Sequence, residues 1–307
     1  MDTPERVFDE ALAIVTSSYP NANHERLKKI YDDIVDLFNG IYPGYRKCST
    51  EYHNLGHTTD VFLAMVRMVH GCEITGEGLT WKIAETAFIS ALMHDTGYIQ
   101  EEDDAVGTGG KFTKVHVDRS IRFAETYLTT LGSDKMDIET CKRLISATSL
   151  SLDIKKIPFA SNEEATAGKM LFSSDILAQM SDRLYLEKLI YLFKEFKEAR
   201  IFGVVNEDEL YRNTLGFYES IRRRLDGDAN YSEKYLRSHF RVRWGVDRDL
   251  YIEGVEKNIN FLRYLLDNHG RDYMENLKRG GIVKKLKGSA GFYYSANPFL
   301  STPPTPS

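Results

Sequence analysis

Cysteine is scarce in this chain, with three residues among 307, and the three stand far apart at Cys48, Cys72 and Cys141. No pair has the C-x-x-C spacing of a cysteine zinc site, and an odd, sparse count does not suit a disulfide framework. The thiols are therefore expected to be reduced, as they are in a cytoplasmic protein.

Long apolar runs are also lacking. No stretch of about 18 or more apolar residues occurs, so no membrane span is expected. The N-terminal residues 1–15 are acidic and amphipathic, unlike the basic-then-apolar order of a secretory signal. These absences together predict a cytoplasmic protein that has no membrane partner.

Neither sign of charge dominates, since 40 Lys and Arg stand against 45 Asp and Glu. Binding to nucleic acid requires clustered Lys and Arg, so a nucleic-acid partner is not expected. A small phosphorylated substrate stays open, because a bound metal can supply the positive charge that the surface lacks.

Apolar residues recur at helical spacing through nearly the whole chain, as Leu27, Ile30 and Ile34 do within residues 25–38. This spacing is typical of amphipathic helices, whereas period-two strand patterns extend over only a few residues. Residues 227–246 give the least regular pattern. Similar stripes predict helices over residues 57–70, 81–95, 113–130, 136–150, 163–180, 183–203, 207–225 and 247–268. The fold class is therefore expected to be all-α.

The pattern also predicts one compact helical domain over residues 1–287. Its site-bearing core would span about 50–180, and its C-terminal helices about 181–287. The acidic and then glycine-rich residues 101–111 predict a loop. Residues 288–307 lose the helical pattern and end in Pro, Ser and Thr, so we expect a disordered tail.

Three segments each direct an ionisable side chain towards the apolar face of an expected helix. The first segment is YHNLGHTTDV, residues 52–61. In it and in the residues that follow, apolar side chains lie at i+4, i+7, i+8 and i+11 from His57, which places His57 on the buried stripe. The segment IAETAFISALMHD ends in His94 and Asp95, with apolar residues 4, 7, 8 and 11 positions before Asp95. In GKMLFSSDI, apolar residues share a face with Asp175.

These inward groups favour a metal site over unrelated core positions. A lone inward His is ordinarily a satisfied core residue, and a lone inward Asp ordinarily caps a helix. Several buried ionisable groups on successive helices are costly unless they are paired or bind a cation. Mixed nitrogen and oxygen ligands suit one or two divalent ions of Zn, Fe, Mn or, more weakly, Mg. Ligand type alone does not choose among these metals.

The order and spacing of these segments resemble the HD superfamily of metal-dependent phosphohydrolases. Within it, YHNLGHTTDV is similar to the Y-H-N-x-x-H-x-x-D-V signature of the class I cyclic nucleotide phosphodiesterases. The resemblance covers roughly residues 50–180 and implies an HD-domain, PDEase-like helical bundle. It implies four ligands for the first metal, namely His57, His94, Asp95 and Asp175. By the same resemblance Asp95 bridges to a second metal, and His53 matches the family's general acid.

The chain departs from that family at two places. After the H-D pair the phosphodiesterases carry H-P-G, whereas this chain reads Thr96, Gly97, Tyr98. The purine-selecting glutamine has no clear match, since Gln179 stands only four residues after Asp175. The substrate is therefore left open among cyclic nucleotides, nucleoside monophosphates and alarmone-type nucleotides.

Five further residues are candidates around this centre. His116 could bind a second metal or a phosphate, or could be a hydrogen-bonded histidine at a helix start. Lys114 could contact phosphate or be solvated. Asn54 is expected to steady the histidines from outside the ligand set. Asp60 is expected either to orient an imidazole or to cap a helix, and Thr148 either to line the pocket or to pack.

Two other features are expected to carry no chemistry. The glycine-rich residues 107–111 lack the G-x-x-x-x-G-K-[ST] spacing of a phosphate loop. Four histidines have no partner by spacing and are expected at the surface: His24, His70, His239 and His269.

The sequence thus predicts an enzyme, a metal-dependent phosphoric ester hydrolase of the HD family. It would cleave a small nucleotide-like phosphoester with metal-activated water, while His53 protonates the departing oxygen. Two alternatives stay open. One is a di-iron HD-type oxygenase, which needs more histidine ligands, and the other is a non-catalytic module that senses a metal or a nucleotide. The oligomeric state stays open between monomer and homodimer.

Overall fold

The fold is an all-α bundle. The computed structural model describes residues 3–201, 206–228, 231–269 and 273–288, and within these it contains twelve α-helices and no strand. The α-helices are α1 Pro4–Ser18, α2 Glu25–Asn39, α3 Leu55–Ile74, α4 Trp81–Met93, α5 His116–Thr130, α6 Lys135–Ser146, α7 Asn162–Ser181, α8 Tyr185–Glu198, α9 Glu207–Asp228, α10 Tyr231–Trp244, α11 Leu250–Asn268 and α12 Ile282–Gly288. Short 3-10 turns lie at Thr96–Tyr98, Gly109–Phe112, Ile154–Lys156 and Tyr273–Asn276.

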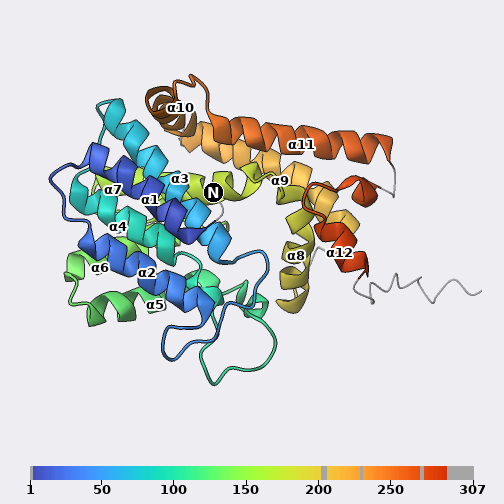
Figure 1. Ribbon diagram of the computed structural model, residues 1–307, viewed down its shortest axis with the longest axis horizontal. Helices are drawn as coiled ribbons and strands as arrows, with labels where there is room; N and C mark the ends of the chain where they lie inside the picture. The colour runs from blue at the N-terminus through green and yellow to red at the C-terminus, as the bar shows by residue number, and fades with distance from the viewer. Residues whose placement is uncertain (1–2, 202–205, 229–230, 270–272, 289–307) are drawn as a thin grey trace, which may run out of the picture.

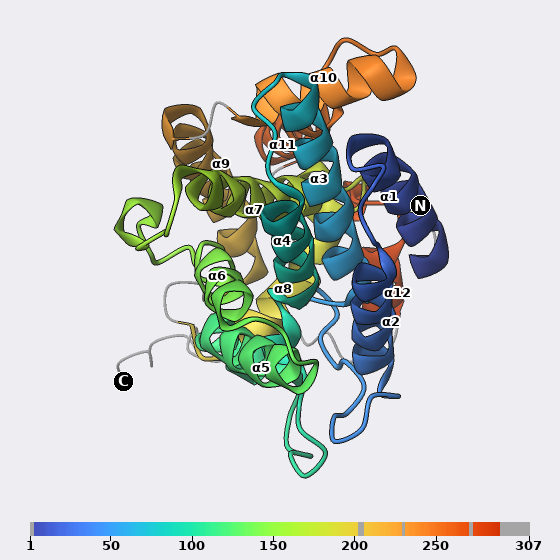
Figure 2. The ribbon, with the colours of Figure 1, turned by 90° about the vertical axis from the view of Figure 1, so that its left-hand side faces the viewer.

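Helix α3 is the central element of the bundle. It packs against α1, α4, α7 and α10, and most of its residues are buried. A helix that is apolar nearly all round is stable only when neighbours cover every side. Figure 2 shows α3 and α4 in the middle of the molecule, with α1 and α2 on one side and α5 and α6 on the other.

The outer helices bury a single stripe. In α2 the buried residues are Leu27, Ile30, Tyr31, Ile34, Leu37 and Phe38, which is the predicted face with one tyrosine added. At the opposite end of the molecule, α11 packs against α7, α9 and α10, and α12 packs against α8 (Figure 1). Helix α8 therefore joins the site-bearing bundle to the last described helix.

Side-chain caps start two of the helices that carry the site, α3 and α7. Asn54 caps α3 by accepting a hydrogen bond from the backbone N–H of His57 at 3.2 Å. Ser161 caps α7 by accepting from the N–H of Glu164, as the sequence predicts. Each cap satisfies a backbone donor that has no partner inside the helix, which is typically worth ~1 kcal/mol.

Several helix boundaries differ from the sequence prediction. The helix expected over 81–95 ends at Met93, with His94 as its last, half-helical residue. The irregular stretch 227–246 contains α10, and α12 was not anticipated. From residue 289 onward the expected tail lies outside the described residues. Among those described, no helix is long and apolar enough to cross a membrane.

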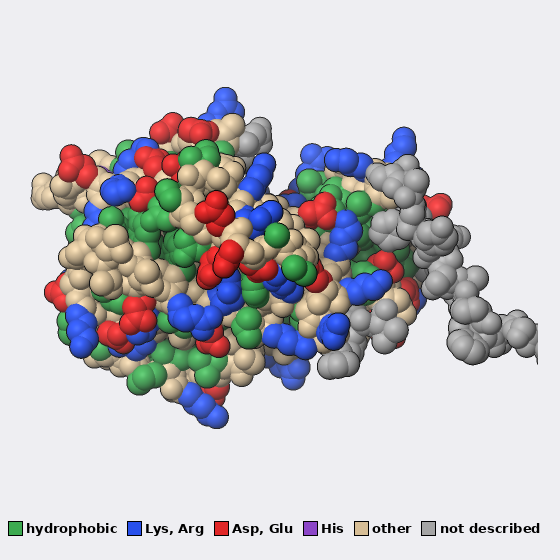
Figure 3. All heavy atoms as spheres, turned by 90° about the horizontal axis from the view of Figure 1, so that it is seen from below, with side chains coloured by type: hydrophobic (Ala, Val, Ile, Leu, Met, Phe, Trp, Pro, Cys, Tyr) green, Lys and Arg blue, Asp and Glu red, His purple; other side chains and the backbone are tan. Residues whose placement is uncertain are grey.

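Charges of both signs are mixed on the surface. On the face drawn in Figure 3, Lys and Arg side chains lie interspersed with Asp and Glu, and no area of one sign dominates it. Some charged residues form ion pairs with a residue four positions away in the same helix, as Lys28–Asp32 does in α2 and Arg212–Asp208 does in α9. Such exposed pairs contribute little to stability.

Candidate metal centre

His57 lies in the first turn of α3, on its buried side. The Asn54 cap fixes the backbone at this turn, and the side chain is almost fully buried. Asn54 therefore steadies His57 through its backbone N–H and not through its imidazole. The amide of Asn54 also donates to the carbonyl oxygen of Glu51 at 2.7 Å, which fixes the turn before the helix.

His94 ends α4 and presents one defined ring nitrogen to the centre. Its Nδ1–H donates to the carbonyl oxygen of Ala91 at 2.8 Å. Because that carbonyl can only accept, the proton sits on Nδ1 and the Nε2 lone pair is free to bind a cation. This backbone bond also fixes the orientation of the ring.

Asp95 lies beyond the end of α4, so the helical phase that predicted its inward direction does not apply. Its backbone, with φ −112° and ψ 8°, begins the 3-10 turn Thr96–Tyr98. The carboxylate still points into the bundle and is 2% exposed. The predicted inward direction of the side chain holds, but the reason given for it is wrong, because a turn directs the side chain and not a helical stripe.

Asp175 comes from the middle of α7 and is held by a residue outside the predicted set. The amide of Gln179, one turn later, donates to Asp175 Oδ1 at 3.4 Å. The hydroxyl of Tyr52 in turn donates to Gln179 Oε1 at 2.8 Å. Gln179 is thus an orienting neighbour of Asp175. The i+4 spacing in the sequence is compatible with this contact but does not predict it.

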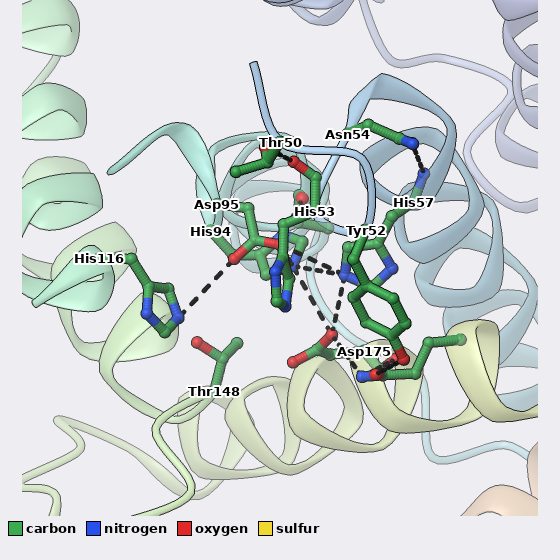
Figure 4. A network of polar contacts seen from close by, with 12 residues as sticks. Thr50, Tyr52, His53, Asn54, His57, His94, Asp95, His116, Thr148 and Asp175 are labelled. Carbon is green, nitrogen blue, oxygen red and sulfur yellow. Dashed lines mark hydrogen bonds and ion pairs between the residues drawn. The ribbon is translucent and has the colours of Figure 1, made fainter. Parts of the chain in front are cut away.

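These four side chains converge on one point (Figure 4). The Nε2 atoms of His57 and His94 lie 3.4 Å apart. Asp95 Oδ2 lies 3.3 Å from His57 Nε2 and 3.2 Å from His94 Nε2. Asp175 Oδ1 lies 3.2 Å and 3.7 Å from the same two nitrogens. The triad His57, His94 and Asp175 is a candidate metal site, and Asp95 borders it.

The donor set fits a cation. Ligand atoms placed tetrahedrally at metal distances of 2.0–2.1 Å lie roughly 3.3–3.4 Å from one another. The observed donor separations of 3.2–3.7 Å match this spacing. Asp95 Oδ2 is buried and makes no hydrogen bond of good geometry. A buried carboxylate oxygen without a donor is costly, and a cation would satisfy it.

Without a cation, protons on the two histidines would balance part of the negative charge of Asp95 and Asp175. Burial acts to lower the pKa of His57, but Asp175 and Asp95 outweigh it and raise that pKa to about 9. The pKa of His94 is raised in the same way, mainly by the charge of Asp95 against burial. Burial acts to raise the pKa of Asp175, but the two imidazoles lower it. A cation entering the site would therefore displace protons from the histidines.

His53 stands beside the ligands and is held by a residue that the sequence reasoning missed. Its Nδ1 lies 2.5 Å from Glu195 Oε2, and Glu195 is 3% exposed. Glu195 also accepts from the backbone N–H groups of Tyr52 and His53, at 2.9 and 3.4 Å. No local spacing could have revealed this contact, because Glu195 comes from α8, 142 residues further along the chain.

His116 is the first residue of α5 and faces the second oxygen of Asp95. Its Nε2 lies 3.8 Å from Asp95 Oδ1, while its Nδ1–H donates to the carbonyl of Thr113 at 2.7 Å. The two oxygens of Asp95 thus point towards different histidines. His116 is therefore a hydrogen-bonded histidine at a helix start, as one of the two predicted alternatives has it, and it also neighbours the centre.

A family model described as Npun_R2479-like matches residues 102–236, less than half of the chain. No curated protein matches the chain. The matched span contains His116, Asp175 and Glu195, whereas His57 and the H-D pair precede it. The description of that family names no activity, so the chemistry must be argued from the geometry.

The remaining candidates lie around the centre with different contacts. Lys114 is exposed, and its ammonium group donates to the carbonyl of Arg200 at 2.8 Å. Thr148 is buried near His116 (Figure 4), and its hydroxyl donates to the carbonyl of Ile145 at 2.9 Å. Asp60 lines a small cavity together with His57 and is partly buried, which raises its pKa. Within the described residues no hydrogen bond joins Asp60 to an imidazole.

Two histidines expected at the surface are buried. His239 is 0% exposed and His70 is 8% exposed, and their Nδ1 atoms lie 3.0 Å apart across the contact of α10 with α3. The expectation was wrong because spacing along the sequence cannot show that a partner comes from a helix 169 residues away.

Proposed function

We propose that the chain is a metal-dependent phosphohydrolase of the HD type. The observation that carries this proposal is the convergence of the candidate triad His57, His94 and Asp175 with Asp95 at its border, beside a further group, His53, that a buried carboxylate holds. Ligands alone would suit a structural metal. A separately oriented imidazole next to them supports a reaction.

His57, His94, Asp95 and Asp175 would hold the first cation. Such an ion lowers the pKa of bound water to about 7 and neutralises charge that develops on phosphoryl oxygens. Mn, Mg, Zn and Fe all fit a set of two imidazoles and two carboxylates. The second oxygen of Asp95, which faces His116 at 3.8 Å, supports a second ion or a phosphate contact there.

His53 would act as the general acid. The Glu195 carboxylate at its Nδ1 orients the imidazole, so that Nε2 would be the nitrogen that gives a proton to the departing oxygen of the substrate. Figure 4 shows the ring of His53 beside the ligand cluster, as this transfer requires. The backbone N–H of His53 on the same carboxylate keeps acid and partner together.

The substrate class that we propose is a small nucleotide-like phosphoester. The mixed surface charge gives no support to a nucleic-acid partner. With Lys114 occupied by a backbone carbonyl, the phosphate charge would be met mainly at the metal centre. We place the protein in the cytoplasm on the strength of its sparse cysteines.

A second candidate function is oxidation of a substrate carbon at two irons. His116 supports it, because it supplies a further imidazole nitrogen close to the carboxylate that would bridge the two ions. Metal analysis separates the two functions: two irons per chain would favour the oxygenase, and turnover of phosphoesters with Mn or Mg would favour the hydrolase.

The proposal is tested by pairing metal analysis with a screen for release of phosphate and nucleoside. We expect His53→Ala to keep its metal and to lose turnover by roughly 10²–10⁴-fold, because only proton transfer is removed. We expect Asp95→Ala to lose both metal and turnover, because a ligand is removed. The hydrolase would be refuted if wild-type protein bound no metal. It would also be refuted if wild-type protein turned over none of the phosphoesters tested with Mn, Mg and Fe. Full turnover in metal-loaded His53→Ala would refute the acid assignment.

A further inference from the structure

Tyr98 lies in the 3-10 turn that follows Asp95, where the sequence departs from the family that it resembles. Its side chain is 1% exposed, although the turn stands next to the proposed reaction site. Its ring stacks on the imidazole of His53, with centroids 4.4 Å apart and planes 8° from parallel. The same ring stacks on His116 at 4.6 Å and 22°.

The backbone that carries Tyr98 is fixed from both sides. A Cβ on Gly97 would lie 2.0 Å from the carbonyl oxygen of His116, so only glycine allows the start of α5 to pack this closely. The guanidinium of Arg119 donates to the carbonyls of Gly97 and Ile99 at 2.8 and 3.0 Å. On the other side, a Cβ on Gly109 would lie 2.0 Å from the carbonyl oxygen of Tyr98. The Tyr98 ring is therefore a fixed surface.

His53 needs such a surface because it precedes the first turn of α3 and has no helical backbone to orient it. Glu195 fixes the position of one ring nitrogen. A single hydrogen bond of this kind still lets the ring plane rotate about the hydrogen-bond axis. A stacked aromatic neighbour fixes the plane. The two contacts together leave the imidazole a single orientation beside the ligands.

We propose that Tyr98 is a positioning residue that holds the His53 imidazole, and with it that of His116, in a fixed plane beside the Asp95 carboxylate. The inference rests on the proposed hydrolytic function, in which His53 is the general acid. Tyr98 itself contacts no reacting atom and acts through the two histidines. On this proposal the Thr-Gly-Tyr segment, where the chain departs from the H-P-G of the family that it resembles, carries the positioning residue.

A double-mutant cycle tests this role. We expect Tyr98→Leu to lower kcat by roughly 10²-fold, since small misplacement of a catalytic group has losses of that size. In the His53→Ala background the same substitution should cause a much smaller loss, because the proposed acid that Tyr98 positions is already gone and only His116 is left to be positioned. Tyr98→Phe, which keeps the ring, should restore most of the turnover that Tyr98→Leu loses. An equal loss in both backgrounds would overturn the proposal.

Matched variants separate this effect from general destabilisation. Tyr31→Leu removes a buried tyrosine whose ring contacts Phe8 and Phe62 and none of the site residues, and it should lower thermal stability but not kcat. If Tyr98→Leu does not fold, Tyr98→Met, whose side chain is similar in volume but longer and more flexible, serves in its place.

A spectroscopic measurement keeps the inference independent of turnover. Side-chain ¹⁵N spectra of the zinc-loaded protein, assigned with His53→Ala and His116→Ala, should show one sharp set of His53 ring-nitrogen signals in wild-type protein and in Tyr98→Phe. In Tyr98→Leu, we expect its signals to broaden or shift towards a mixture. Unchanged signals in Tyr98→Leu would overturn the positioning role. Absent turnover in wild-type protein would instead refute the hydrolase, while these spectra still decide the role of Tyr98.

Discussion

Glu195 links the proposed acid to a helix that carries none of the metal ligands. Its carboxylate receives the Nδ1 side of His53 and two backbone N–H groups, all in a buried environment. A carboxylate in this position both orients an imidazole and stabilises its protonated form. On the proposed function Glu195 would affect proton transfer and would take no direct part in binding the ion.

We expect Glu195→Gln to keep its metal and to lower kcat by roughly 10–100-fold, the usual size for losing an orienting partner. The amide keeps the shape of the side chain but not the charge that stabilises the imidazolium. Phosphate release and metal content, measured on the same sample, check this. Glu198→Gln is the matched control, because Glu198 on the same helix hydrogen-bonds Thr108 and, among the described residues, none of the proposed site residues. Wild-type kcat in Glu195→Gln would show that His53 needs no charged partner.

At this scale the sequence predicted what depends on local phase. His57 and Asp175 lie on buried helical stripes, and the structure places them where that phase directs them. Asp95 shows the limit of the argument, since its direction comes from a turn after Met93. Glu195 shows a second limit. Its pairing with His53 depends on how α8 packs, and the sequence around neither residue indicates that contact.

At the scale of elements, α3 and α10 make a close backbone contact. A Cβ on Gly71 would lie 1.8 Å from the carbonyl oxygen of Tyr235, so the two backbones touch there. Beside this point His70 and His239 form a buried hydrogen-bonded pair. The sequence gave no clear prediction for α10, because its many charged residues obscure the apolar face that α3 covers.

The histidine pair predicts acid sensitivity. Burial, the neighbouring His70 and the charges of Arg67 and Arg243 lower the pKa of His239 to about 3. The unfolded chain would bind a proton near pH 6.5. Stability that is full above pH 6.5 is therefore lost as the pH falls from 6.5 towards 3, by on the order of a few kcal/mol.

Urea unfolding at several pH values between 7 and 4 measures this loss. We expect His239→Gln, which cannot titrate, to lose less stability over that interval than wild-type protein does. His269→Gln, at the end of α11, is the matched control and should follow the wild-type curve. If wild-type protein and His239→Gln lost stability in parallel, the pair would not be the source of the acid sensitivity.

At the scale of the whole molecule, the ligands tie together parts of the chain that are far apart. His57 begins α3, His94 and Asp95 follow α4, and Asp175 lies in α7, so the unfolded chain cannot present them together. The sequence predicted the helices and their inward faces. It could not predict how closely the ligand atoms approach, since the donor distances depend on the packing of three helices at once.

A cation that binds this set should therefore stabilise the folded protein as a whole. At a free concentration of Mn or Zn about 100 times its Kd, the gain is roughly 2.7 kcal/mol, which raises the unfolding temperature by several degrees. We expect Asp175→Asn to lose this gain, because the substitution removes a ligand.

Glu187→Gln is the control. It should lower the starting stability, since Glu187 on α8 accepts from the backbone N–H groups of Gly280 and Ile282, yet it should keep the full gain. Thermal unfolding with and without metal measures all three proteins. An equal gain in Asp175→Asn would place the ion outside the four-residue set, and a gain lost in both variants would mean that general destabilisation and not ligand removal governs it.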